Sequence, residues 1–328
     1  MIQKLYIEPA SACNLHCKMC FRHQWFDENV GLMKESVLDA VRLAIQEPEI
    51  ETVFFGGMGE PLLHPALPEL VKTAAHAGKQ TELITNGTLL TAEKARQLTD
   101  AGLNRLWLSM DGFSRESYEA IRRGGIYETL MRNLDEWNRI PAHPKLGLTF
   151  VMMRENLREL DGINEFADQV GADRLNLSHV LPGEPLAEED ALYHADLPVG
   201  KMHRFAPECV RPPEDYCPFV AENQCFIRWD GEVCPCMQLL HNSYTYLYEE
   251  KRKVSRYSFG NICTQDIRHI WNGDAYVRFR ECVTDFSFPC CTICMGCEDR
   301  LENKTDCMFH SAPTCGACLW ARGWIRCP

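Results

Sequence analysis

Three cysteines near the start of the chain have a spacing that suits an iron–sulfur cluster. Cys13, Cys17 and Cys20 form the pattern C-x3-C-x2-C. A [4Fe–4S] cluster takes four ligands, one for each iron. Three close cysteines without a fourth leave one iron open to a small molecule. The spacing therefore predicts a reactive cluster rather than one that only carries electrons.

Zinc and disulfide bonds are the structural alternatives for these cysteines. Zinc sites usually combine paired C-x2-C elements, and no second pair lies near this one. Disulfides belong to oxidising compartments. The chain runs from Met1 directly into a strand-like segment without a signal-peptide pattern, so we expect a cytoplasmic protein. Both observations favour the cluster.

A glycine-rich run, Gly-Gly-Met-Gly-Glu-Pro at 56–61, follows a strand-like segment downstream. Gly56, Gly57 and Gly59 allow backbone amides and carbonyls to approach a ligand where a side chain would block them. A tight strand-to-helix turn is the alternative interpretation of such a run. Its position behind the cysteine triplet favours a ligand-binding loop.

The cysteine pattern and the 56–61 run together resemble the radical S-adenosylmethionine (SAM) superfamily, although Met19 stands where that family usually carries an aromatic residue. The resemblance implies that the open iron binds the amino nitrogen and carboxylate of SAM. An electron, supplied by a reductant such as ferredoxin or flavodoxin, then cleaves the sulfonium to methionine and a hydrogen-abstracting 5′-deoxyadenosyl radical. The resemblance also implies that the glycine loop contacts the amino group of SAM, with Glu60 and Pro61 fixing its shape.

The first 180 residues alternate strand-like and helix-like segments. The predicted strands are short runs of branched and aromatic residues, as in buried parallel sheets: Lys4–Glu8, Thr52–Phe55, Thr81–Thr85, Arg105–Ser109, Leu146–Met152 and Arg174–Ser178. The predicted helices lie between and after them: Lys34–Gln46, Ala66–Ala77, Ala92–Ala101, Arg115–Arg122, Glu128–Asn138 and Leu157–Val170. Six such units predict parallel strands with right-handed crossovers. A closed barrel needs eight, so we expect the α/β partial (β/α)6 TIM-like barrel of the radical SAM family.

Polar residues follow the third and fourth predicted strands, where a parallel sheet places ligand-binding groups. By resemblance, Asn86, Ser109 and Asp111 contact the ribose hydroxyls and carboxylate of SAM. Asn-Gly and Asp-Gly are also favoured turn dipeptides, which is the alternative role for Asn86 and Asp111. Arg122 or Arg123 could neutralise the SAM carboxylate, and a solvated helix end is the alternative for either.

The cysteines divide the chain into unequal parts, because fifteen of the eighteen lie from Cys209 onward. Cys217, Gly231 and Cys236 give the pattern C-x13-G-x4-C. This pattern resembles the opening of the SPASM extension, which carries one or two auxiliary [4Fe–4S] clusters. Two fully ligated cubes need eight thiolates. Zinc is the alternative, since C-x2-C pairs also suit it.

The later cysteine spacing departs from the usual SPASM pattern, so the ligands are assigned as an expectation. We expect Cys217, Cys236 and Cys307 on the nearer cluster, with Cys225 or Cys234 as the fourth ligand. The expected ligands of the farther cluster are Cys291, Cys294 or Cys297, Cys315 or Cys318, and Cys327. We expect Cys209, Cys263 and Cys282 to be thiols without a ligand role.

The closing stretch 313–328, together with 303–307, resembles radical SAM maturases that accompany tungsten-cofactor oxidoreductases. This resemblance implies that the substrate is a tungsten oxidoreductase or its cofactor. We expect a radical SAM core over 1–200 and a SPASM domain over 201–328. Trp320 and Trp324 could equally be core anchors beneath a cysteine-rich lid.

Composition excludes some function classes and leaves others open. A net charge of −12 argues against nucleic acid as a main partner. No apolar run approaches the roughly 20 residues that span a bilayer. Two other functions remain as alternatives to tungsten-enzyme maturation. One is a peptide maturase that crosslinks a small precursor; because the chain begins just before its first strand, we expect any leader-binding domain to be a separate protein. The other is an iron–sulfur electron-transfer protein without a SAM site.

Overall fold

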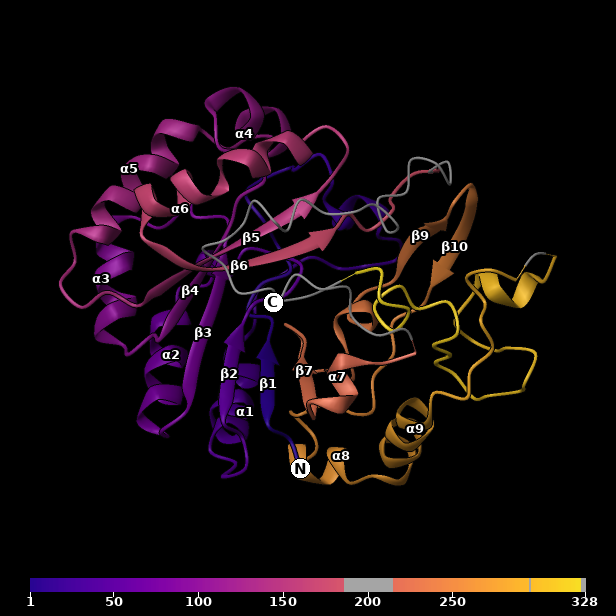
Figure 1. Cartoon of the computed structure of the whole chain (residues 1–328). Coiled ribbons are helices and arrows are strands. Elements are labelled where there is room, and N and C mark those ends of the chain that lie inside the picture. The colour runs from indigo at the N-terminus through magenta and orange to yellow at the C-terminus, as the bar shows by residue number, and fades with distance from the viewer. Residues whose placement is uncertain (186–214, 295, 326–328) are drawn as a thin grey trace.

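Six parallel strands alternate with helices over the first 180 residues of the computed structural model, which describes residues 1–185, 215–294 and 296–325. The strands are β1 (Lys4–Ile7), β2 (Thr52–Phe55), β3 (Gln80–Thr85), β4 (Arg105–Ser109), β5 (Lys145–Met152) and β6 (Ala172–His179). The helices are α1 (Glu35–Ile45), α2 (Leu67–His76), α3 (Ala92–Asp100), α4 (Arg115–Ile121), α5 (Tyr127–Asn138) and α6 (Ile163–Val170). These elements confirm the predicted succession, and the helices lie on the outer side of the sheet (Figure 1).

The predicted helix ends agree with local backbone chemistry. Thr91 accepts a hydrogen bond from the amide of Lys94 and so caps the start of α3. Gly171 has φ of +74° and ends α6, as expected of a glycine after a helix. The helix predicted over 157–170 instead begins as a 3-10 turn, Leu157–Gly162, and becomes α6 only at Ile163.

The sheet does not stop at the sixth strand. Its order is β6-β5-β4-β3-β2-β1-β7-β8, with β7 (Gln224–Ile227) parallel to β1 and β8 (Val233–Cys234) antiparallel to β7. The cysteine-rich region therefore extends the same sheet as the barrel strands. The expected boundary at 200/201 lies outside the described residues.

Alternate residues of the strands serve two different cores. Leu5 and Ile7 of β1 pack into the layer between sheet and helices. Tyr6 points to the inner face, where its ring stacks on Phe226 of β7 at 4.3 Å and lies 4.8 Å from Phe54 of β2. This alternation follows from the two-residue period of a strand. Aromatic rings from three neighbouring strands therefore pack together on the inner face of the sheet.

The C-terminal region covers this aromatic face. It contains α7 (Pro218–Ala221), the antiparallel hairpin β9 (Ser243–Leu247) and β10 (Glu250–Val254), α8 (Ile267–Trp271), α9 (Asp274–Asp285) and the 3-10 turn η8 (Glu298–Leu301), all to one side of the barrel (Figure 1). Trp320 and Trp324 are buried and pack in the same cluster as Tyr6. They are core anchors, as one of the two interpretations held. In the described residues, no helix is long and apolar enough to cross a membrane.

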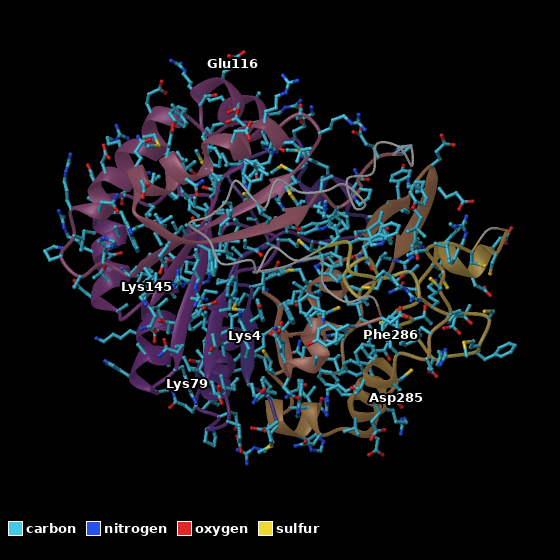
Figure 2. The ribbon with its side chains drawn as sticks, viewed as in Figure 1. Lys4, Lys79, Glu116, Lys145, Asp285 and Phe286 are labelled. Atoms are coloured by element: carbon cyan, nitrogen blue, oxygen red, sulfur yellow. The ribbon has the colours of Figure 1, made fainter. Side chains whose placement is uncertain are left out.

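The two edges of the sheet have different roles. Lys4 and Lys145 begin β1 and β5 and mark the amino ends of the strands (Figure 2). The cysteine loop and the glycine loop follow the opposite, carboxyl ends of β1 and β2. The candidate site therefore lies at the edge where parallel sheets bind ligands.

Candidate active site and auxiliary cysteine groups

A cavity of about 290 Å³ lies at the carboxyl ends of the strands. Its walls bring together most of the predicted site residues: Cys13, Cys17, Cys20, Gly57, Gly59, Glu60, Asn86, Ser109 and Arg122. The C-terminal region contributes Met237, Trp320 and Ile325. The barrel and the cysteine-rich region thus enclose one site.

The loop that carries the three cysteines is held by its backbone. The amides of His16 and Lys18 donate to the carbonyls of Arg123 and Ile121, at 2.9 and 2.8 Å. The ring of His23 lies 3.0 Å from the carbonyl oxygen of Cys17. His23 therefore supports the loop through its backbone.

The thiols of the triplet influence one another, with Cys17 buried and Cys13 and Cys20 partly buried. Burial raises the pKa of Cys13 and Cys17, and repulsion from Cys20 adds to both shifts. A metal centre offsets this cost, because coordination stabilises the thiolate. The donor set therefore fits a cluster held by three thiolates with one open position.

Close packing, rather than ligand approach alone, explains the glycines of the 56–61 loop. A Cβ on Gly59 would lie 2.2 Å from the carbonyl oxygen of Ala10, in the cysteine loop. A Cβ on Gly56 would lie 2.4 Å from the side chain of Ile84. A side chain at position 59 would thus push the glycine loop away from the cysteine loop, and one at position 56 would clash with β3.

Glu60 fixes the shape of this loop. Its carboxylate accepts hydrogen bonds from the amides of Leu62 and Asn86, at 3.0 and 2.8 Å, and from the hydroxyl of Thr85 at 2.7 Å. Burial raises the pKa of Glu60, and these three donors oppose that shift. The side chain connects the end of β2 to the end of β3.

Asn86 combines a turn role with a contact to the cluster loop. Its side-chain oxygen accepts from the amide of Thr88 at 3.0 Å, which is the turn chemistry of an Asn two residues upstream. Its side-chain nitrogen donates to Asn14 at 3.0 Å and lies 3.8 Å from the sulfur of Cys13. Both ends of the amide are thus engaged by the protein itself.

Asp111 and Arg122 form a buried ion pair behind the cysteines. Arg122 Nη2 lies 2.6 Å from Asp111 Oδ2, and Asp111 also accepts from the amide of Val151 at 2.8 Å. Arg122 Nη1 lies 3.9 Å from the sulfur of Cys17. Asp111 was expected to contact SAM directly, but the structure places it outside the residues that line the cavity. It positions Arg122, which does line the cavity.

Ser109 lies at the cavity wall, as expected, with its hydroxyl 3.3 Å from that of Thr149. Asn176 and Ser178, which belong to none of the predicted motifs, also line the cavity from the end of β6. Their i, i+2 spacing on a predicted strand places them on one face, so this pair carried a usable signal.

Four cysteines of the C-terminal region form one electrostatic group: Cys217, Cys236, Cys315 and Cys318. Burial raises the pKa of each thiol, and repulsion from Cys318 adds to the shift at the other three. Among the described residues, no three His, Cys, Asp or Glu side chains converge closely enough to hold a metal ion. A four-iron cube takes one thiolate per iron. The ligands of a cluster therefore lie farther apart than the ligands of a single metal ion.

This grouping differs from the expected ligand sets. Cys225 lies in the sheet opposite Leu5 of β1, fully buried, with its thiol beside the hydroxyl of Tyr276. Cys234 faces Arg228 and neighbouring acidic side chains instead of other cysteines. None of the four grouped cysteines is among the main charges that shift the pKa of either thiol, and strand pairing, which the spacing could not reveal, holds both thiols in the sheet.

A second set of cysteines lies further out. Burial raises the pKa of Cys291, and Asp306 and Cys307 raise it further, so Cys307 lies near Cys291. Cys294 is exposed and Cys297 is partly exposed. Cys209 and Cys327 lie outside the described residues.

Arg252 of β10 provides an independent indication of an anionic centre. Its side chain is buried, and its Nε donates to the carbonyl of Arg300 at 3.1 Å. Burial lowers the pKa of Arg252, while the thiols of Cys318, Cys315 and Cys291 oppose that shift. A buried cation is costly without a countercharge. Thiolates on a cluster would supply one, so the residues present fit the group.

Comparison with known proteins agrees with this arrangement. The model of the radical SAM superfamily matches residues 7–167, and that of the SPASM iron–sulfur cluster-binding domain matches residues 217–298. The site and the fold thus define a SAM-cleaving iron–sulfur enzyme. The chain belongs to the radical SAM superfamily and carries a C-terminal SPASM domain.

One curated relative matches almost the whole chain. The tungsten-containing aldehyde ferredoxin oxidoreductase cofactor-modifying protein of Pyrococcus furiosus is 30% identical, over 99% of this chain and 96% of the relative. The PqqA peptide cyclase of Bradyrhizobium diazoefficiens is 32% identical over 53% of this chain and 45% of its own length. The full-length match includes the cysteine-rich end.

Solved structures share the fold. The enzyme anSMEcpe with bound AdoMet has a TM-score of 0.62 at 19% identity, covering 92% of this chain and 88% of that chain. SuiB of Streptococcus suis bound to S-adenosylmethionine has a TM-score of 0.63 at 17% identity, covering 90% and 71%. Both confirm the expected architecture of barrel and C-terminal domain.

Proposed function

We propose that this chain matures a tungsten-dependent oxidoreductase, by modifying either that enzyme or its cofactor. The observation that carries the proposal is the 30% identity to the Pyrococcus furiosus cofactor-modifying protein over nearly all of both chains. Sequence similarity in the closing cysteine- and tryptophan-rich stretch supports it. Bound at the triplet, a cluster and SAM would supply a hydrogen-abstracting 5′-deoxyadenosyl radical.

The residues of the cavity have separable roles in this proposal. Cys13, Cys17 and Cys20 hold the cluster, while the 56–61 loop and Ser109 bind SAM. Arg122, a cation beside Cys17, stabilises the negative charge of the thiolates. Met237 and Trp320 close the cavity on the side of the SPASM domain and exclude water from the reacting atoms.

The grouping of the auxiliary cysteines supports one assignment of cluster ligands within this proposal. Cys217, Cys236, Cys315 and Cys318 hold the nearer cluster. Cys291, Cys294, Cys297 and Cys307 hold the farther one, because their C-x2-C-x2-C run is a spacing that [4Fe–4S] proteins use. Since Cys294 and Cys307 are exposed, a reductant such as ferredoxin or flavodoxin can reach the farther cluster.

Anaerobic co-expression tests the proposed function. The tungsten oxidoreductase of the same organism is produced with the wild-type chain or with its C13A/C17A/C20A variant. We expect a change in the intact mass of the oxidoreductase or of its extracted cofactor, or in its tungsten content, only with the wild-type chain. Identical mass and metal content in both preparations would overturn the proposal.

Two further readouts separate the alternatives. Reduced, reconstituted protein incubated with SAM is analysed for 5′-deoxyadenosine and methionine, and their absence would favour an electron-transfer protein. A small co-expressed peptide whose mass falls by the mass of the hydrogens removed in a crosslink, with the oxidoreductase unchanged, would favour a peptide maturase. Production of 5′-deoxyadenosine together with a modified oxidoreductase or cofactor supports the proposal.

A further inference from the structure

His241 of the C-terminal region lies between two buried carboxylates. Its Nε2 is 3.0 Å from both carboxylate oxygens of Glu8, and its Nδ1 is 3.0 Å from Oε2 of Glu28. The side chains of all three residues are at most 3% exposed. Ionised carboxylates only accept hydrogen bonds, whereas a neutral imidazole has a single N–H donor. Both ring nitrogens can donate only in the imidazolium form, so the geometry calls for a charged histidine.

An aromatic ring favours the same charge state. Trp25 stacks on His241 with a centroid distance of 4.0 Å and an interplanar angle of 23°. A cation over an indole face is stabilised by the ring quadrupole. Trp25 follows directly after the cysteine loop and pairs with Ser243 in a β-bridge. The histidine therefore also contacts the chain that emerges from the cluster site.

The other charged groups around the histidine pair mainly with Glu28 and with one another. Glu28 also accepts from Nη1 of Arg256 at 2.8 Å, and Nη1 of Arg228 lies 3.7 Å from it. Arg228 in turn pairs with Asp230. Burial alone would lower the pKa of His241, but the carboxylates outweigh burial and raise that pKa above its ordinary value. Glu28 shows the matching decrease in pKa, because its hydrogen-bond donors outweigh burial.

Glu8 transmits the position of the histidine to the glycine loop. Oε1 of Glu8 accepts a hydrogen bond from the amide of Met58 at 2.9 Å. The same side chain fills the space beside Gly57, where a Cβ would lie 2.5 Å from Cγ of Glu8. Gly57 and Met58 both line the cavity next to the cysteines. A rotation of Glu8 would therefore move the cavity wall.

We propose that His241 is a positioning residue for SAM, acting from the SPASM domain through Glu8 on the 56–61 loop. The imidazolium orients the Glu8 carboxylate, and the carboxylate orients the amide of Met58. The auxiliary domain thus completes the SAM site in a way that the barrel alone does not. The inference rests on SAM occupying the cavity beside the cysteines.

Equilibrium binding of SAM to the reconstituted, oxidised full-length protein tests the inference. H241Q removes the charge and one of the two donors. A hydrogen bond to a charged group contributes enough that we expect about tenfold weaker SAM binding near neutral pH. Wild-type affinity should fall as the pH rises through the deprotonation of His241, and this step should be missing in H241Q.

Two variants distinguish positioning from a general structural effect. H64Q alters another buried histidine, one whose ring is hydrogen-bonded to the backbone carbonyl of Met33 and the backbone amide of Ala66, so its effect on SAM binding should not depend on pH. In E8Q/H241Q the neutral amide at position 8 still accepts from Met58 and needs no cation. We expect the double variant to bind SAM several-fold more tightly than H241Q.

The electron paramagnetic resonance spectrum of the reduced cluster with SAM gives a second readout, because SAM on the open iron changes that spectrum. H241Q should need more SAM than wild type to reach the same spectrum. If wild type binds no SAM, the SAM site itself is wrong. If wild type and H241Q bind SAM equally at every pH, the inference is overturned and the radical SAM assignment stands.

Discussion

Gly59 lies directly against the carbonyl oxygen of Ala10, so that a Cβ at position 59 would lie 2.2 Å from that oxygen. The contact joins the glycine loop to the cysteine loop through backbone atoms, which cannot rotate away as a side chain can. The register between the two loops therefore depends on this glycine.

The first prediction follows from that contact. G59A should separate the loops, lower the stability of the protein by about 1–3 kcal/mol, as overpacking usually does, and reduce the iron bound by the triplet. Gly162 is the control, because a Cβ there meets nothing within 4 Å and its φ is −96°. G162A should keep wild-type iron content and 5′-deoxyadenosine formation. Equal iron in both variants would show that the contact is dispensable.

The second prediction concerns the ion pair of Asp111 and Arg122. D111N leaves the guanidinium buried without its carboxylate, which typically costs about 3–5 kcal/mol. In D111N/R122M no charge is left unpaired, so the double variant should be more stable than D111N. Denaturant unfolding of the apoproteins gives both values. A double variant no more stable than D111N would show that the pair is not coupled.

Much of the fold could be predicted from local pattern. The six strands and their helices are visible as apolar runs separated by glycine stops such as Gly171. Strand order then placed Cys13, the 56–61 loop and Ser109 at one edge of the sheet. This step worked because parallel strands bring their carboxyl ends together.

The remaining features depend on long-range pairing. Nothing in the spacing of Cys225 shows that its strand pairs with β1, or that Cys315 and Cys318 return to Cys217. Likewise, His241 has no local signal for its contact with Glu8, 233 residues away. Cysteine spacing predicted the kind of centre, and only the fold could group its thiols.

The third prediction concerns acid stability. The pKa of Glu28 is lower in the folded protein than its ordinary value, since its hydrogen bonds outweigh burial. Glu28 therefore stabilises the fold above its unfolded pKa, and this contribution is lost as the pH falls through the folded pKa. E28Q should be less stable than wild type near pH 7 and should lose less stability between about pH 5 and 3. Urea unfolding of the apoproteins measures this, and parallel pH profiles for the two would contradict it.

The fourth prediction tests the nearer auxiliary group. C318A should remove one cluster, a loss of about four irons per chain. Cys225 offers a matched control, because it is a buried thiol beside Tyr276 and none of the four grouped cysteines is among the main charges that shift its pKa. C225A should retain full iron content after anaerobic reconstitution. Loss of iron in C225A and not in C318A would reverse the grouping.

The fifth prediction concerns Arg252, the buried cation that faces Cys315, Cys318 and Cys291. Reduction adds negative charge to a cluster, and a nearby guanidinium stabilises that charge. R252Q should therefore make the reduction potential of the auxiliary cluster more negative. The expected shift is roughly 40 mV, which corresponds to a change of about 1 kcal/mol in a one-electron couple. Anaerobic redox titration followed by electron paramagnetic resonance measures the potential.

Arg268 supplies the control for that shift. Arg268 pairs with Glu47 on the surface. R268Q therefore removes one positive charge, as R252Q does, but the charge is exposed and strongly screened by solvent. We expect no more than a small change in potential. R252Q also removes the hydrogen bond from Arg252 to the backbone of Arg300. The iron content of R252Q is therefore measured together with its reduction potential, to show that the clusters are still bound. Full iron with an unchanged potential would mean that Arg252 does not act on the cluster.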